Sequence, residues 1–443
     1  MSEMQKLTTR IDRLAATFPL GHVTAVNSGL IDIAGLGDIA GIGDRVRISR
    51  RGGQALEAEI VGLGGDRIRA LPDGPSTHIA VGDSVRLGAA LPFSPDESWI
   101  GRVVDPMGRP VDGLPLTHGT ICCDVDALPP PAAARRPFGA RLGTGLCVFN
   151  TMLPIVRGQR IGLFAGSGVG KSQLMASFAR HLEADLVVIA LIGERGREVG
   201  HFVRDVLGPQ GMARSIVVAA SSDQSPLLRR RCAGAAMAVA EHFRDKGQHV
   251  LLLADSVTRF AEAHREIAVA SGEPPALRGY PPSTAAMIGA LCERAGPGMG
   301  TQGDITAVFS VLVAGSDMEE PVADMLRGVL DGHVVLSRSI AERGRYPAID
   351  VLQSVSRSLP DAAEDQENQR IGEARRLLGA YQQAEVMIQS GLYSAGSDPL
   401  LDQAVRAWPE LDAFVARQEA GGIKSSFDRL NLILRRSGSA TNR

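Results

Sequence analysis

A glycine-rich segment, AGSGVGKS at 165–172, follows the apolar run RIGLF and has the composition of a phosphate-binding loop. Backbone N–H groups bind phosphate oxygens in such loops, and glycines keep side chains from blocking the approach. Lys171 would neutralise the β- and γ-phosphates of a nucleotide, and Ser172 would coordinate Mg²⁺. Ala165 stands where the usual pattern has glycine, a mild departure. The residues predicted to surround the phosphates are Gly166, Ser167, Gly168, Val169, Gly170, Lys171 and Ser172.

An aspartate ends a second apolar run, VLLLADS at 250–256. The carboxyl ends of parallel strands meet at one edge of a sheet, so we expect Asp255 beside the phosphate loop, where a carboxylate can hold Mg²⁺ or its waters. An isolated strand-end aspartate is usually a turn residue. Together with the phosphate loop, magnesium binding is the better interpretation.

A third apolar run leads into IGERGREVGHF at 192–202. Glu194 is predicted to polarise the attacking water, because hydrolysis needs a positioned acceptor near the γ-phosphate. Arg195 is predicted to steady the phosphate oxygens. The alternative is a surface cluster with internal ion pairs, which is the default for Arg197 and Glu198.

The segment YPAIDVLQSVSR at 346–357 carries two further candidates. Tyr346 is predicted to lie against an adenine ring. Arg357 is predicted to stabilise transition-state charge, and an arginine supplied from a neighbouring subunit is worth roughly 10³–10⁵ in rate. Exposed arginines are common, so the local sequence alone does not establish this role.

The elements that position these residues follow from the apolar pattern between about 155 and 350. Near-continuous apolar runs alternate there with helix-compatible segments, which predicts a parallel sheet covered on both faces. The predicted strands are RIGLFA (160–165), LVVIALIG (186–193), SIVVAA (215–220), HVLLLAD (249–255) and ITAVFSVLVA (305–314).

Residues 21–93 show a different pattern, in which short runs of β-type residues alternate with Gly and Asp. Several short strands at close spacing predict a small closed β-barrel. Two segments nearly repeat, IGDRVRI at 42–48 and VGDSVRL at 81–87, with Gly-Asp as the turn. The predicted strands lie in GHVTAV, GLIDIAG, DRVRISR, AEIVGL, DRIRAL and DSVRLG.

The two ends of the chain are predicted to be helical. Near the N-terminus, apolar residues recur at three- and four-residue steps, which predicts a short amphipathic helix. It either caps the neighbouring domain or docks a partner. The residues of this apolar seam are Met4, Leu7, Ile11, Leu14 and Phe18. We expect four regions: a helix over 1–20, a β-barrel over 21–95, a P-loop domain over 96–360 and a helical domain over 361–443.

Composition narrows the class of protein. A net charge of −2 and 4 % aromatic residues argue against a nucleic-acid binder, which needs basic patches and stacking platforms. No apolar stretch of about 18 residues occurs, so no membrane span is expected. Five cysteines without a CxxC pair fit reduced thiols in a cytosolic protein.

As a set, AGSGVGKS, GERGREV, LLLADSVTRF, GEPPALRGYPPS and YPAIDVLQSVSR resemble the rotary ATP-synthase-type ATPases. They are most similar to the type III export ATPases of the bacterial flagellum and of the related virulence injectisome. The resemblance covers nearly the whole chain, including GSDPLLDQAVRAWPEL near the C-terminus. It implies a β-barrel, a RecA-like α/β P-loop domain and a C-terminal α-helical domain.

The resemblance also implies a homohexamer that binds ATP and Mg²⁺ at each subunit interface. One subunit would supply Lys171, Ser172, Glu194, Arg195 and Asp255, and the next would supply Arg357. Tyr346 matches the base-stacking aromatic of the family. Noncatalytic synthase subunits lack a glutamate at the position of Glu194, so this chain is predicted to be catalytic. A homo-oligomer needs both halves of a site on each chain.

The implied partners are a second copy of the chain, a stator-like regulatory protein bound by the N-terminal helix, export-gate membrane proteins, export substrates and their chaperones. The implied location is the cytoplasm, peripheral at the export apparatus of the inner membrane. We favour the flagellar system over the injectisome. Two other classes rank lower, a hexameric RNA translocase and a noncatalytic nucleotide-binding ring component; Glu194 argues against the latter.

Overall fold

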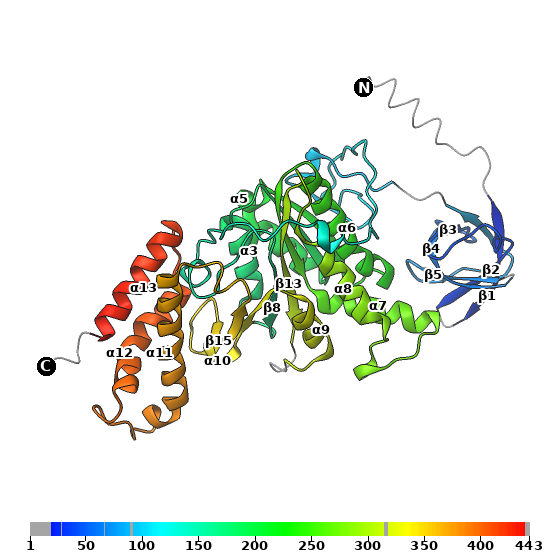
Figure 1. Cartoon of the computed structure of the whole chain (residues 1–443). Helices are drawn as coiled ribbons and strands as arrows, with labels where there is room; N and C mark the ends of the chain where they lie inside the picture. Colours follow the sequence, from blue (N-terminus) through cyan, green and yellow to red (C-terminus); the bar gives the residue numbers. More distant parts are fainter. Residues whose placement is uncertain (1–18, 28, 66, 89–91, 314–317, 439–443) are drawn as a thin grey trace. The chain divides into compact units, whose positions relative to one another are not determined.

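The computed structural model describes residues 19–27, 29–65, 67–88, 92–313 and 318–438 (Figure 1). The N-terminal barrel forms one compact unit with residues 223–230 and 263–281, and the other described residues form a second. The predicted helix over 1–20 falls on residues outside the described ones, apart from its last two. Within the described ranges, no helix is both long enough and apolar enough to cross a bilayer.

Six antiparallel strands close into the barrel predicted for the N-terminal region, in the order β1-β2-β5-β4-β3-β6. Side chains alternate between the interior and the solvent, and Val23, Ile33 and Ile60 are fully buried inside. All six predicted strands are present. They are β1 (Leu20–Asn27), β2 (Leu30–Ala34), β3 (Arg45–Ile48), β4 (Leu56–Gly64), β5 (Arg67–Pro72) and β6 (Ser84–Leu87).

The repeated Gly-Asp segments form two equivalent turns. The carboxylate of Asp44 accepts a hydrogen bond from the N–H of Gly41 at 2.7 Å, and Asp83 accepts one from Ala80 at 2.7 Å. Each aspartate thereby fixes the turn that starts a strand. The two strands that follow, β3 and β6, pair with each other. The repeat therefore builds two neighbouring strands of the barrel, each preceded by the same kind of turn.

A nine-stranded sheet forms the centre of the second unit, with the order β15-β14-β8-β13-β11-β9-β10-β7 along its main path in the described chain. The five predicted strands are confirmed as β8 (Arg160–Ala165), β9 (Leu186–Glu194), β10 (Ser215–Ser221), β11 (His249–Asp255) and β13 (Asp304–Leu312). Four strands did not stand out in the sequence: β7 (Val103–Val104), β12 (Gly296–Pro297), β14 (Gly332–Leu336) and β15 (Ile349–Ser356). β15 runs antiparallel to β14.

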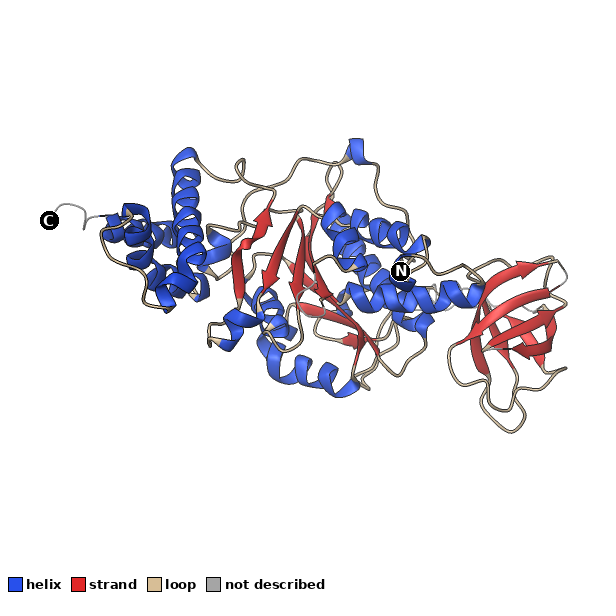
Figure 2. Cartoon of the chain, turned by 90° about the horizontal axis from the view of Figure 1, so that it is seen from below, coloured by secondary structure: helices blue, strands red, loops and turns tan. Residues whose placement is uncertain are grey.

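The connections place helices on both faces of this sheet, as predicted (Figure 2). Crossovers between parallel strands are right-handed, and the chain moves along the sheet in one direction after β8 and β9 and in the other after β10, β11 and β13. One face therefore carries α3 (Lys171–His181), α4 (Gly196–His201), the π-helical η3 (Phe202–Leu207) and α5 (Gly208–Met212). The other carries α6 (Pro226–Asp245), α7 (Val257–Ser271), α8 (Ser283–Arg294) and α9 (Pro321–Val329).

The predicted C-terminal helical region is present as α11 (Asp365–Gln389), α12 (Pro399–Ala416) and α13 (Gly422–Gly438) (Figure 1). Glu364 and Glu367 form a capping box at the start of α11, and Asp398 caps α12. The helices bury Leu411, Phe414 and other apolar side chains in the same core as the phosphate-loop strand. Shorter helices elsewhere are α2 (Cys147–Asn150) and α10 (Arg338–Glu342).

Candidate active site

The predicted phosphate loop lies between the end of β8 and the start of α3. Gly168 and Gly170 have φ angles of 78° and 90°, in the left-handed region that favours glycine. A loop with these turns directs backbone N–H groups inward, and the first N–H groups of α3 have no partner within the helix. Both features favour a bound anion at this position.

Lys171 and Asp255 meet beside this loop, as the sequence predicted. The ammonium of Lys171, on the first turn of α3, contacts Oδ1 of Asp255 at the end of β11. The hydroxyl of Ser310, from the adjacent strand β13, donates a hydrogen bond of 2.7 Å to the same oxygen. Asp255 is only 4 % exposed, so its carboxylate is held in place by these two partners. Ser172 follows on the exposed side of α3.

Glu194 is the last residue of β9, which lies next to β11 in the sheet. Burial and, to a lesser extent, the nearby charge of Asp255 raise the pKa of its carboxyl group to about 7, although Lys171 opposes the rise. A carboxyl group with a pKa near neutrality can take up a proton from water at working pH. The predicted proton acceptor therefore lies at the same sheet edge as Lys171 and Asp255.

Arg195 is placed differently from the residues around it. Its side chain is exposed and pairs with Glu198 at 3.5 Å, so the structure does not bring it to Lys171. Arg259, on the first turn of α7, was not predicted. Hydrogen bonding to Glu262 raises its pKa, and the charges of Glu194 and Glu198 contribute. The sequence did contain a signal for it, since Arg259 follows Asp255 by four residues on the next helix.

Tyr346 lies against the phosphate loop. A Cβ atom added at Gly170 would be 3.1 Å from Cδ1 of the tyrosine ring. Tyr346 is about half exposed, so part of its surface is accessible to a ligand. Arg345, which precedes Tyr346, donates hydrogen bonds to the carbonyls of Pro347 (2.9 Å) and Ile349 (2.8 Å), which follow it. These bonds connect the backbone before Tyr346 to the backbone after it.

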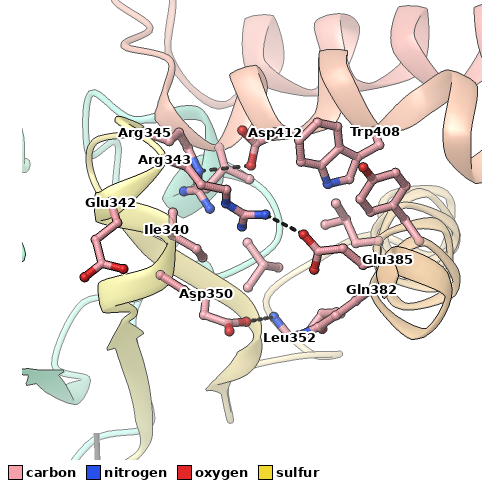
Figure 3. A pocket seen from close by; sticks show the side chains of 15 residues that line it. Ile340, Glu342, Arg343, Arg345, Asp350, Leu352, Gln382, Glu385, Trp408 and Asp412 are labelled. Atoms are coloured by element: carbon pink, nitrogen blue, oxygen red, sulfur yellow. Dashed lines mark hydrogen bonds and ion pairs between the residues drawn. The ribbon is translucent and has the colours of Figure 1, made fainter. Parts of the chain in front are cut away.

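A cavity of about 400 Å³ lies between residues 339–352, which we call the Tyr346 loop, and the C-terminal helices α11 and α12 (Figure 3). The guanidinium of Arg345 pairs with Asp412 of α12 at 3.1 Å, and Arg343 pairs with Glu385 of α11 at 2.8 Å. The Trp408 ring lies in the cavity wall near Arg343. Two ion pairs thus connect the Tyr346 loop to the helical region.

Arg357 lies near the N-terminal ends of the parallel strands, whereas the phosphate loop lies at their C-terminal ends. Leu336 of β14 is level with both Ala165 and Ile349, whereas the far end of β15 is level with the start of β8. The six residues of β8 span roughly 17 Å at about 3.3 Å per residue. Arg357 therefore cannot reach the phosphate loop of its own chain.

The site fits Mg²⁺ as part of a nucleotide substrate rather than as a resident metal. Within the described residues, no group of three or more His, Cys, Asp or Glu side chains is arranged to hold a metal ion. Mg²⁺ that arrives with a nucleotide needs only one or two protein ligands beside the phosphates. Asp255, which contacts Lys171, and the exposed Ser172 next to Lys171 in the sequence are the residues that could supply these ligands.

Comparisons with known proteins agree with this fold. The model of the ATP synthase alpha/beta family, nucleotide-binding domain, matches residues 145–356, and that of the T3SS EscN ATPase C-terminal domain matches 363–430. The flagellum-specific ATP synthase of Caulobacter vibrioides is 44 % identical, over 97 % of this chain and 99 % of that protein. The type 3 secretion system ATPase of Xanthomonas euvesicatoria is 41 % identical, over 91 % and 92 %.

The assembled ATPase EscN of the enteropathogenic E. coli type III secretion system has the same fold. It superposes with a TM-score of 0.86 at 32 % identity, covering 94 % of this chain and all of EscN. EscN in complex with its central stalk EscO superposes with a TM-score of 0.84 at 33 % identity, with the same coverage.

The fold and the phosphate loop define a P-loop enzyme that hydrolyses ATP. Within that class, the chain belongs to the family of flagellum-specific and type III secretion ATPases.

Proposed function

We propose that this chain is the Mg-ATP hydrolysing ATPase of a flagellar type III export apparatus and acts as a homohexameric ring. The convergence of the phosphate loop, Asp255 and Glu194 at one sheet edge supports hydrolysis. The position of Arg357 at the opposite edge is the observation that carries the shared-site ring.

The phosphate loop binds the triphosphate through its backbone N–H groups, and Lys171 neutralises the β- and γ-phosphates. The Ser172 hydroxyl and Asp255 bind Mg²⁺ or its waters. Because the Lys171 ammonium touches Asp255, a metal ion at this carboxylate lies within reach of the same phosphates. The loop residues in this role are Gly166, Ser167, Gly168, Val169 and Gly170.

Glu194 orients the attacking water and accepts its proton. Arg195, which is exposed at the start of α4 and pairs with Glu198 in this structure, turns to the γ-phosphate when nucleotide is bound. Arg259, which is within electrostatic reach of Glu194, adds positive charge on that side of the site. Tyr346 stacks on the adenine ring with the face that is not covered by the phosphate loop.

Arg357 acts on the nucleotide of the neighbouring subunit. Its own phosphate loop is out of reach, and each chain carries both Glu194 and Arg357, so a ring of identical chains completes every site. Head-to-tail contacts of this kind are heterologous and generate a closed ring when the rotation from one subunit to the next closes. Arg357 then stabilises the charge of the transition state as an arginine finger.

The flagellar assignment is supported by the greater identity and coverage of the Caulobacter relative compared with the Xanthomonas protein and EscN. ATP hydrolysis there promotes the delivery and unfolding of export substrates at the cytoplasmic side of the inner membrane. The partners are export substrates with their chaperones and the export-gate membrane proteins. A stator-like regulatory protein binds the apolar seam of residues 1–20. The EscN complex with its stalk supports a regulatory partner of this general kind.

The ring is tested by measuring the Mg²⁺-dependent ATPase rate per chain over a wide range of protein concentration. We expect the specific activity to rise with concentration and then to reach a plateau, because only assembled chains have complete sites. Arg357→Ala should lower the plateau by roughly 10³-fold without weakening nucleotide binding to the separate chain. A specific activity that is independent of concentration and unaffected by Arg357→Ala would rule out shared sites.

A further inference from the structure

Arg357 follows β15 directly, and its backbone is attached to the loop that precedes β14. Its N–H donates a hydrogen bond of 3.0 Å to the carbonyl of Asp331. The guanidinium is exposed, and Nη2 donates to the carbonyl of Arg327 at 3.2 Å. In the part of the chain that the structure describes, no carboxylate forms an ion pair with this guanidinium. The positive charge of Arg357 is therefore available to a ligand from outside the chain.

Asp331 is itself tightly held. Arg160, the first residue of β8, donates to the Asp331 carboxylate from its N–H (3.0 Å), Nε (2.9 Å) and Nη2 (3.1 Å). The N–H of Asp331 donates back to the carbonyl of Arg160 at 2.9 Å. The buried amide of Gln159 donates to the carbonyl of Asp331, which thus accepts from both Gln159 and Arg357. A two-pronged contact between arginine and carboxylate fixes geometry as well as charge.

The Arg160 side chain stays charged in this position. Burial lowers its pKa, but the hydrogen bonds that Arg160 donates to Asp331 and Glu293, together with the charges of these carboxylates, more than offset burial, so the pKa lies above its ordinary value. Both side chains of the Arg160–Asp331 pair are mostly buried. Such a pair is strongly directional and costs free energy when one partner is removed.

We propose that Asp331, held by Arg160, is a positioning residue that aims Arg357 at the nucleotide of the neighbouring subunit. The inference rests on the proposed shared site and names the residues that prepare its second half. The strand β8 carries Arg160 at one end and leads into the phosphate loop at the other. β8 thus supports Arg357 through Arg160 and Asp331 at its N-terminal end, and the phosphate loop at its C-terminal end. In the proposed ring these two ends belong to two different nucleotide sites.

The test mixes variants that are defective in different halves of the site. Asp331→Asn keeps the size of the side chain but removes the charge that orients the fork of Arg160. We expect kcat to fall about tenfold with little change in the KM for ATP, because only an interaction made in the transition state is weakened. Mixed in equal amounts with Glu194→Gln, Asp331→Asn should recover about a quarter of wild-type activity, the fraction of randomly formed interfaces with two intact halves. Mixed with Arg357→Ala, it should recover nothing beyond the mean of the separate rates.

A matched control is Asp304→Asn. Asp304 also lies at the start of a strand at this sheet edge and pairs with Arg136 (2.7 Å) and Arg157 (2.5 Å), but it makes no contact with Arg357. Its loss should lower thermal stability without the selective pattern in mixtures. Arg160→Lys, which keeps the charge and loses the fork, gives a milder variant should Asp331→Asn not fold.

The outcomes separate this inference from the proposed function. Recovery with Glu194→Gln and none with Arg357→Ala supports the positioning role. If Asp331→Asn recovers equally with both, or with neither while Glu194→Gln and Arg357→Ala complement each other, the positioning role is wrong. Failure of Glu194→Gln and Arg357→Ala to complement each other would contradict the shared site itself.

Discussion

At the scale of single residues, Glu194 differs from the other carboxylates of the site. Asp255 is paired with Lys171 and accepts from Ser310, whereas Glu194 is half-buried with a pKa of about 7. The two environments fit the different tasks that we propose, metal binding for the paired carboxylate and proton transfer for the one with a pKa near neutrality.

Glu194→Gln is therefore expected to lower kcat by about 10²–10⁴-fold while leaving nucleotide binding nearly unchanged, because the amide cannot accept a proton. Steady-state rates and titration with a fluorescent nucleotide measure the two quantities. Glu183→Gln, an exposed carboxylate at the end of α3, is the matched control and should keep its activity. Comparable rates for Glu194→Gln and wild type would assign proton transfer to another group.

The raised pKa of Glu194 also predicts a pH-dependent stability. The folded protein favours the protonated form of Glu194, because the carboxylate is poorly solvated there. The loss of folding free energy from ionising Glu194 is therefore absent below about pH 4.5 and grows until the pH passes about 7. At pH 8, and after allowance for partial solvent exposure, Glu194→Gln should stabilise the protein by about 1–2 kcal/mol, a Tm rise of a few degrees. At pH 5 the two Tm values should nearly coincide. An equal difference at both pH values would show that the carboxyl charge is not its source.

At the scale of elements, the strands with continuous apolar runs could be predicted because a strand buried on both faces needs no alternation. β14 and β15 lie at one side of the sheet, and β15 is exposed at Gln353 and Val355, so it lacks a continuous buried apolar run. Its sequence therefore resembled a loop that carries Tyr346 and Arg357. β15 runs antiparallel to β14, so Tyr346 and Arg357 lie at opposite ends of the sheet's strands. This direction depends on long-range pairing and has no local signal in the sequence.

The same limit explains what was missed in the site. Lys171, Asp255 and Glu194 each end or follow an apolar strand, so parallel topology alone predicts their meeting. Arg259 reaches the site through the direction of α7, and Asp331 through a contact with Arg160 that is 171 residues away in sequence. Arg259 could have been found from its place four residues after Asp255, whereas no spacing rule in the local sequence reveals Asp331.

The contact between the Tyr346 loop and α12 gives a prediction for these elements. Asp412→Asn removes the charge that anchors Arg345, which brackets Tyr346 (Figure 3). We expect the KM for ATP to rise about fivefold to tenfold with little change in kcat, because base binding is equal in ground and transition states. Glu410 lies on the same helix as Asp412 but pairs with Arg436 of α13, so Glu410→Gln should behave like wild type. Unchanged KM in Asp412→Asn would mean that the helix does not position Tyr346.

At the scale of the whole molecule, we propose that each chain contributes one half to each of two shared sites. The phosphate loop, Asp255 and Glu194 lie at one edge of the sheet, and Arg357 lies at the other. The family resemblance predicted shared sites, and the strand register supplies a physical reason for them. Composition alone could not, because net charge and hydropathy are those of an ordinary soluble enzyme.

The most direct measurement of the shared site is the ATPase rate of an equal mixture of Glu194→Gln and Arg357→Ala. Each variant alone should be nearly inactive. In a randomly mixed ring, about a quarter of the interfaces combine an intact Glu194 with an intact Arg357, so the mixture should recover about a quarter of the wild-type rate. A mixture that stays as inactive as its components, although the chains assemble together, would contradict catalysis by two subunits at each site.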